Sequence, residues 1–170
     1  SLAVWMNGER VGLWSAPPGR PQIFRYDDAW LNNEARRVLS LSLPFTVGNE
    51  PLRGVSVSNF FENLLPDNDQ IRRRIQTRFH ADSGSAFDLL AAIGRDCVGA
   101  IQLLPETHEP PEVKTIQAKR LDETGVAQTI RTTLSSGSAL AGNETDEFRF
   151  SIAGAQEKTA LLYHKGSWCI

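Results

Sequence analysis

Hydrophobic and polar residues alternate near the start of the chain in the way that β-strands require. Two short apolar runs, residues 2–6 and 11–14, flank Asn7-Gly8, and an Asn-Gly pair readily adopts the positive φ angles of a tight type I′ hairpin turn. After a proline-rich break, the alternation over residues 22–26 predicts another strand. The chain is therefore expected to open with a β-hairpin and a third strand of the same small sheet.

A helical turn and another strand are expected next. Asp27 or Asp28 can cap a short helical turn that includes Trp30. Residues 39–43 alternate strictly between leucine and serine, which would place three leucines on one face until Pro44 ends the strand. We expect this segment to be a half-buried strand.

From Val55 onward, apolar residues recur at a spacing of about four, which is typical of amphipathic helices. The apolar positions are Phe60 and Leu64, Phe61 and Leu65, and the series Ile71, Ile75 and Phe79. Pro66 separates two helices, and Asp67 or Asn68 can cap the second one. His80 lies at the end of that helix, where we interpret it as a cap rather than a ligand.

The second helix has a basic outer face. Its arginines are Arg72, Arg73, Arg74 and Arg78. We interpret them as a solvated helix face with local ion pairs, and contact with phosphate or an acidic partner is the alternative.

A third helix and a buried strand follow. Ser85 followed by Asp88 resembles a capping box, and the apolar residues after it predict a short buried helix that Gly94 ends. Residues 97–104 predict a largely apolar strand. Gly99 within it would let a flat ligand such as a nucleobase approach closely, and relief of packing explains a glycine there equally well.

The composition changes after this strand. Residues 107–114 contain two prolines among polar side chains, which indicates a linker and a domain boundary. Apolar positions over residues 121–134 predict a modest helix weakened by Gly125. A serine-rich loop then runs to about Thr145.

The last part of the chain has the pattern of a phosphate-binding hairpin. Residues 147–152 form an alternating strand with Ser151 on its polar side, at the point where strand becomes loop. The small residues 153–155 allow successive backbone N–H groups to converge on an anion. Lys158 can add a positive point charge.

Two further strands are expected after this loop. Residues 159–163 would form a strand that returns antiparallel. After a turn at Lys165-Gly166, a further strand would run to Ile170. A Walker A loop is rejected, because Glu157 occupies the position that requires glycine and a strand follows where a helix should begin. On local chemistry alone, a plain β-turn is the better interpretation.

Length and composition indicate one domain or two small ones. The chain has 170 residues, of which 41% are hydrophobic, and this suffices for a buried core. A net charge of -2 and a pI near 5.9 give no general attraction to nucleic acid. Cys97 and Cys169 have no CxxC spacing, so we expect reduced thiols in a cytosolic protein, with one long-range disulfide as the alternative.

No membrane association is expected. No apolar run approaches the roughly 20 residues that span a bilayer, and the first residues lack the basic region of a signal peptide. We therefore expect a soluble, cytoplasmic protein. The absence of an initiating Met leads us to expect that part of the start has been removed.

Several stretches of the sequence together carry a family resemblance. The stretches are, in order, Trp5-Met6-Asn7 with Arg10-Val11-Gly12, Leu39-Ser40-Leu41-Ser42-Leu43-Pro44, Asn59-Phe60-Phe61-Glu62-Asn63-Leu64-Leu65-Pro66-Asp67, Phe87-Asp88-Leu89-Leu90, Ile93-Gly94-Arg95-Asp96 with Val98-Gly99-Ala100, and residues 148–162. They resemble the HipA family of toxin serine/threonine kinases from bacterial toxin-antitoxin modules. They are spread along the whole chain.

The resemblance implies an α+β protein that is the N-terminal portion of a two-lobed, kinase-like fold. Residues 1–105 would form a small β-rich and helical N-terminal subdomain. Residues 106–146 would be a linker with a weak helix. Residues 147–170 would begin the ATP-binding lobe and contain its phosphate loop.

The resemblance also implies roles for individual residues. Ser151 matches the serine that the family autophosphorylates, a change that inactivates the kinase by ejecting this loop. Val98 matches a residue that lines the adenine site. The ATP phosphate loop matches Ala153, Gly154, Ala155, Gln156, Glu157 and Lys158. The implied cofactors are ATP and Mg²⁺.

The implied partners are those of a persistence toxin. The family phosphorylates glutamyl-tRNA synthetase, and a helix-turn-helix antitoxin of the HipB type neutralises it and carries the complex onto operator DNA. The remaining C-terminal kinase lobe would complete the active site.

The catalytic groups of such a kinase are missing from this sequence. Phosphoryl transfer needs a catalytic Asp and ligands for Mg²⁺, and none follows Lys158 here, so we expect them outside this chain and expect the chain to be inert by itself. Asp96 precedes the phosphate loop, and we assign it to the subdomain. The alternative function is a non-catalytic N-terminal module that binds and restrains a partner kinase, although such a module has no reason to retain the phosphate loop.

Overall fold

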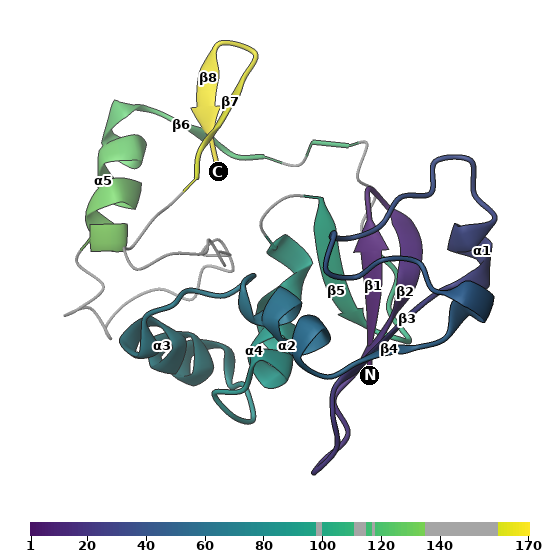
Figure 1. Ribbon diagram of the computed structural model, residues 1–170. Helices are drawn as coiled ribbons and strands as arrows, with labels where there is room; N and C mark the ends of the chain where they lie inside the picture. Colours follow the sequence, from purple (N-terminus) through teal and green to yellow (C-terminus); the bar gives the residue numbers. More distant parts are fainter. Residues whose placement is uncertain (98–99, 111–114, 117, 135–159) are drawn as a thin grey trace.

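The computed structural model describes residues 1–97, 100–110, 115–116, 118–134 and 160–170. These residues form an α+β protein with two antiparallel sheets, as Figure 1 shows, which confirms the predicted fold class. The first sheet has five strands in the order β4-β3-β2-β1-β5, and the second has three in the order β6-β8-β7. Within the described residues, no helix has the length and apolar character needed to cross a membrane.

The first sheet is built on the predicted hairpin. Its strands are β1 (Leu2–Met6), β2 (Glu9–Ser15), β3 (Ile23–Tyr26), β4 (Leu52–Arg53) and β5 (Ile101–Pro105). Asn7 and Gly8 have φ angles of 53° and 82°, so both residues adopt the left-handed conformation that a type I′ turn requires. β5 pairs with β1 from the far side. Of the strand predicted over residues 97–104, residues 98 and 99 lie outside the described residues, and β5 begins at Ile101.

The strand predicted over Leu39–Leu43 is wrong. The segment turns back on itself through a bridge between Ser40 and Leu43, and Leu41 is 95% exposed whereas Leu43 is fully buried. The three leucines therefore do not share a face. Local hydrogen bonds close this turn, since the Ser40 hydroxyl accepts from the Ser42 N–H and the Ser40 carbonyl accepts from the Leu43 N–H. The Tyr26 hydroxyl holds it in place, accepting a hydrogen bond from the Leu39 N–H at 2.9 Å and donating one to the Leu43 carbonyl at 2.6 Å.

Most helices begin where the sequence predicts. They are α1 (Asp28–Leu31), α2 (Val55–Glu62), α3 (Asp69–Phe79) and α4 (Ala86–Ile93), with 3₁₀ turns η1 (Val47–Asn49) and η2 (Gly94–Asp96). The Asn68 side chain accepts from two N–H groups of α3, and the Ser85 hydroxyl accepts from the Asp88 N–H at 3.2 Å. Both predicted caps are thus confirmed. Asp27 precedes α1, but its carboxylate pairs with Arg10 at 2.8 Å and makes no capping hydrogen bond.

Gly94 has a packing role in addition to ending α4. Its φ of -66° is ordinary right-handed backbone, so conformational freedom does not explain the glycine. A Cβ atom at this position would lie 2.6 Å from the Leu103 Cβ and 2.9 Å from the Leu103 carbonyl oxygen. The absent side chain therefore lets η2 lie directly against β5.

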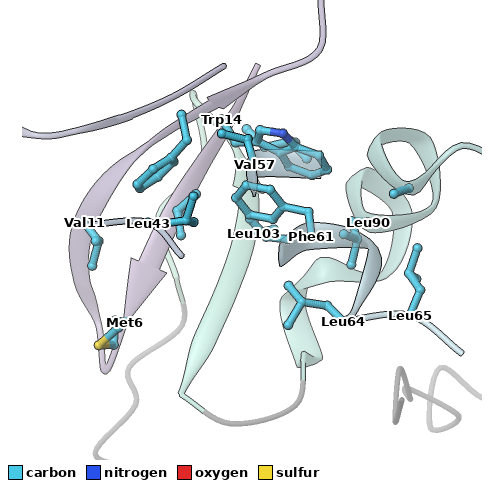
Figure 2. Close-up of a cluster of buried hydrophobic side chains, with 14 of the residues drawn as sticks. Met6, Val11, Trp14, Leu43, Val57, Phe61, Leu64, Leu65, Leu90 and Leu103 are labelled. Carbon is cyan, nitrogen blue, oxygen red and sulfur yellow. The ribbon is translucent and has the colours of Figure 1, made fainter. Parts of the chain in front are cut away.

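The core lies between one face of the first sheet and the helices. Figure 2 shows side chains of β1, β2 and β5 pointing toward those of α2 and α4. The Trp14 and Phe61 rings stack with centroids 3.8 Å apart and planes 11° apart, and the Phe87 ring meets Trp14 edge-on at 4.9 Å. Trp14 and Phe61 are fully buried and Phe87 is partly buried, so aromatic rings join the sheet to α2 and α4 at this point.

The second sheet contains the end of the chain. Its strands are β6 (Arg120–Leu121), β7 (Leu162–His164) and β8 (Ser167–Cys169), and α5 (Glu123–Leu134) follows β6. Lys165 and Gly166 have φ angles of 48° and 76°, which confirms the predicted turn. The helix predicted over residues 121–134 begins two residues later, because Leu121 pairs with Trp168 in the sheet.

Candidate functional site

The predicted phosphate loop lies outside the residues that the structure describes. The residues concerned are Ser151, Ala153, Gly154, Ala155, Gln156, Glu157, Lys158 and Val98. The strand predicted over residues 147–152 and Gly99 lie outside them as well. Their roles stay predictions, and the structure describes only the elements that precede and follow them.

The two residues that flank positions 98 and 99, Cys97 and Ala100, each make a hydrogen bond. The Cys97 thiol donates to the Gly94 carbonyl at 3.5 Å. The Ala100 carbonyl accepts from the Asn7 N–H at 3.2 Å. Cys97 therefore lies directly after η2, and Ala100 lies just before β5, at the end of the sheet where β1 turns into β2. Asp96 belongs to η2, directly after α4.

The strand that follows the predicted loop is an edge strand of the second sheet. In the order β6-β8-β7, the outer edge of β7 has no strand partner within the described residues. The strand predicted over residues 147–152 would pair at this edge if it ran antiparallel to β7. Of the strand predicted over residues 159–163, Thr159 lies outside the described residues, and β7 begins at Leu162, which lies opposite Cys169.

The aromatic side chains of the β7–β8 hairpin form a cross-strand pair. Tyr163 lies opposite Trp168 in the register, and their rings meet edge-on at 5.0 Å. Both remain exposed, Tyr163 by 62% and Trp168 by 48%. Cys169, by contrast, is buried, so this small sheet presents its aromatic side chains to the surroundings.

Arg72 and Arg78 of α3 have partners close by in the sequence. Arg72 is half-buried, pairs with Glu62 at 2.6 Å and donates to the Pro66 carbonyl at 2.6 Å, so it is not on the solvated face as predicted. The Arg78 guanidinium lies 5.6 Å from the centroid of the Phe79 ring. Local contacts of this kind support the interpretation of α3 as a structural helix. His80 ends it in the left-handed conformation, as the predicted cap.

The cysteines and acidic residues form no further chemical site in the described part of the chain. Cys97 and Cys169 are both free thiols, as predicted. No group of three or more histidine, cysteine, aspartate or glutamate side chains there is arranged to hold a metal ion. The expectation that Mg²⁺ ligands come from outside this chain is therefore not tested by these residues.

A surface hollow on the outer face of β2 and β3 was not found from the sequence. It has a volume of about 380 Å³ and lies between the sheet, the start of α1 and Pro51. Its lining residues are Arg10, Leu13, Ser15, Ile23, Arg25, Tyr26, Asp27, Asp28 and Pro51. The alternation of apolar and charged residues in β3 could have indicated the polar face, but only the strand register shows which side chains come together.

These features define an α+β protein with a five-stranded antiparallel sheet, a helical layer and a separate small sheet that follows a predicted anion loop. The sequence profile of the family described as HipA N-terminal domain matches residues 2–104, more than half of the chain. The chain belongs to the HipA N-terminal domain family.

Longer proteins resemble almost the whole chain. "Putative kinase Y4mE" of Sinorhizobium fredii (strain NBRC 101917 / NGR234) is 36% identical over 168 residues, which is 97% of this chain and 39% of that protein. "Putative kinase Y4dM" of the same strain is 31% identical over 164 residues, which is 92% of this chain and 34% of that protein. The chain thus spans well under half the length of these curated relatives.

A solved structure has the same fold. A chain in the structure described as the Shewanella oneidensis MR-1 toxin antitoxin system HipA, HipB and its operator DNA complex superposes with a TM-score of 0.66. The match covers 99% of this chain and 37% of that chain at 24% identity. At this level of identity the likeness shows the fold alone.

Proposed function

We propose that this chain is the N-terminal part of a toxin-antitoxin serine/threonine kinase. The observation that supports this most strongly is the 36% identity to a protein named as a kinase over 97% of the chain, a span too long to exclude the predicted loop. The family match to residues 2–104 supports the assignment of the N-terminal subdomain.

In this proposal the chain supplies the nucleotide-binding loop and the regulatory serine. The backbone N–H groups of residues 153–157 and the Lys158 ammonium would hold the phosphates of ATP, and Val98 would line the adenine site. A loop of small residues with one lysine suits an anionic phosphate chain. Mg²⁺, when bound, neutralises charge on the phosphates, and its ligands would lie outside this chain. Ser151 would accept phosphate in autoregulation.

The proposed partners follow the same family. We propose that the complete protein binds a HipB-type helix-turn-helix antitoxin, reaches operator DNA through it, and phosphorylates glutamyl-tRNA synthetase in the cytoplasm. These partners are supported by the similar Shewanella oneidensis structure, which is described as a complex of HipA, HipB and operator DNA. The proposed substrate rests on the sequence resemblance.

The proposal is tested on a protein that contains this chain and the C-terminal lobe of its own gene. Incubation with ATP and Mg²⁺ followed by phosphopeptide mapping should find phosphate on Ser151, and Ser151→Ala should abolish it. Ser56→Ala, a change at an exposed position of α2, should leave the phosphate in place. Phosphate that persists at another residue in Ser151→Ala would contradict the regulatory role.

A kinase assay on glutamyl-tRNA synthetase tests the substrate separately. Lys158→Met should lower its phosphorylation by about a hundredfold or more, because a charge that positions the transferring phosphate acts mainly through electrostatics. If the protein phosphorylates itself but not this synthetase, the kinase proposal stands and the substrate is wrong. If the chain alone inhibits a separate kinase and the longer protein has no activity, the alternative of a restraining module is correct.

A further inference from the structure

The outer face of the first sheet has an apolar floor beside exposed charges. In the register, Leu13 lies opposite Arg25 and Ser15 lies opposite Ile23, so these four side chains share the face that points away from the helices. Leu13 and Ile23 are only half-buried, and they line the hollow of about 380 Å³ described above. The main core therefore lies on the opposite side of the sheet, and this face is left with a recess of its own.

Two arginines on this face have no acidic partner. Arg53 of β4 lies opposite Ile23, and Arg25 is two residues from Ile23 on the same face. Such diagonal neighbours are about 7–8 Å apart. Both side chains are exposed, and neither makes an ion pair or a side-chain hydrogen bond within the described residues.

The other charges of the hollow are already engaged. Arg10 pairs with Asp27 at 2.8 Å, and the Asp28 carboxylate accepts from the Asn49 side chain at 2.8 Å. Because the Asn49 amide is neutral, Asp28 keeps its negative charge, and Arg25, Arg53 and Asp28 together leave this face with one net positive charge, which lies on the side of the two arginines. Placing two like charges close together without a counter-charge is unfavourable, and an incoming carboxylate would relieve it.

The wall of the hollow is held in place before any partner arrives. Asn49 donates from the same side-chain nitrogen to the Tyr26 carbonyl at 2.8 Å and to Asp28. Pro51, two residues later, forms part of the wall. A recess whose walls are fixed by hydrogen bonds loses little conformational entropy on binding.

We propose that this surface, the β2–β4 face formed by Leu13, Ile23, Arg25, Pro51 and Arg53, docks a segment of another protein in which acidic side chains stand next to apolar ones. The apolar side chains would enter the hollow over Leu13 and Ile23. The carboxylates would pair with the two arginines, for which the guanidinium fork provides bidentate contacts.

A nucleic acid fits this face less well than such a segment. Asp27 and Asp28 line the same hollow, so a polyanion with a charge at every residue would bring phosphates next to these carboxylates, whereas a peptide segment can place its few carboxylates at Arg25 and Arg53 and its apolar side chains over the rest of the hollow. The apolar floor also offers nothing to a sugar-phosphate backbone. The proposal does not depend on kinase activity, and its test uses only binding.

The test is NMR on the ¹⁵N-labelled 170-residue chain titrated with short synthetic probes. The probes are a peptide of mixed leucine and glutamate, a peptide of leucine and lysine, a peptide of serine and glutamate, and an oligothymidylate. We expect the leucine–glutamate peptide to shift the amide signals of Leu13, Ile23 and Arg25 more strongly than the other probes. R25E/R53E should weaken this binding by about tenfold or more, and R25K/R53K should retain most of it.

A matched control separates this surface from general charge effects. R73E/R131E makes the same charge change at two exposed arginines of α3 and α5 and should leave the affinity nearly unchanged. Equal binding by the lysine peptide, stronger binding of the oligonucleotide at these amides, or no shift at Leu13, Ile23 and Arg25 with any probe would each overturn the proposal. Loss of binding in R73E/R131E equal to that in R25E/R53E would also overturn it.

Discussion

The Trp14 ring of β2 lies flat against the Phe61 ring of α2, with centroids 3.8 Å apart. Both side chains are fully buried, and Phe24 and Phe87 meet this pair edge-on at 6.2 and 4.9 Å. The stack is therefore the contact that fixes α2 on the sheet. Aromatic pairs of this kind contribute energy beyond the area they bury.

Removing one ring of this stack should destabilise the domain strongly. Phe61→Ala would leave a cavity against Trp14, and such changes cost about 3–5 kcal/mol in the free energy of unfolding. Urea unfolding followed by Trp fluorescence measures the change. Leu41→Ala is the control, because Leu41 is 95% exposed and its loss should cost less than about 0.5 kcal/mol. Similar losses in both variants would show that the stack is not a main source of stability.

The Tyr26 hydroxyl should stabilise the loop between Leu39 and Leu43. Tyr26→Phe removes the two hydrogen bonds to the backbone of that loop and leaves a buried carbonyl without a donor, which costs about 1–3 kcal/mol. Hydrogen exchange of the Leu39 amide should become faster. Tyr163→Phe, at a 62% exposed position, should change neither stability nor exchange. An unchanged Leu39 amide in Tyr26→Phe would contradict the role of the hydroxyl.

The same tyrosine should make stability depend on pH under alkaline conditions. Burial raises the pKa of Tyr26 from 10.0 to about 12, and the hydrogen bond from the Leu39 N–H only partly opposes this. The folded state keeps its proton to higher pH than the unfolded state, so the free energy of unfolding should be constant below the unfolded pKa and fall as pH rises from about 10 towards 12. The slope from this one group is at most about 1.4 kcal/mol per pH unit.

Urea unfolding at several pH values between about 9 and 11.5 measures this slope. Other tyrosines and lysines titrate in the same range, so the informative quantity is the difference between the wild type and Tyr26→Phe. The variant should show the shallower decline. Parallel curves for the two proteins would mean that Tyr26 ionises alike in both states.

Adding a single methyl group at Gly94 should disturb the contact between η2 and β5. In Gly94→Ala, the new Cβ would lie 2.6 Å from the Leu103 Cβ and close to the Leu103 carbonyl. Backbone must then shift, and overpacking of this kind costs about 1–3 kcal/mol. Gly84→Ala is the control, since its Cβ meets only the Gln76 side chain at 3.7 Å. Thermal unfolding should distinguish the two variants, and equal melting temperatures would contradict the close contact.

Elements set by neighbours in the sequence were predictable. The Asn7-Gly8 turn depends on the φ angles of two adjacent residues, and the start of α3 depends on Asn68 and the N–H groups just after it. The Lys165-Gly166 turn is another case, because its left-handed angles again belong to two adjacent residues. In each case the backbone angles or hydrogen bonds that decide the conformation belong to residues close together in the sequence, so the residue pattern alone was sufficient. For the candidate site, the residues of the anion loop were predicted from their small size, one lysine and the family resemblance, and they stay a prediction because they lie outside the described residues.

Tertiary contacts decided the rest. The alternation of Leu39–Leu43 favoured a strand, yet Ser40 accepts hydrogen bonds that close a turn within the segment, and the Tyr26 hydroxyl of a distant strand bonds to both ends of that turn. Gly94 is required by the Leu103 backbone rather than by its own φ angle. Arg25 and Arg53 share a face only because β4 pairs with β3 in one register. The sequence by itself thus determined the local turns, caps and helices, whereas partners distant along the chain could be recognised only once the strands were paired.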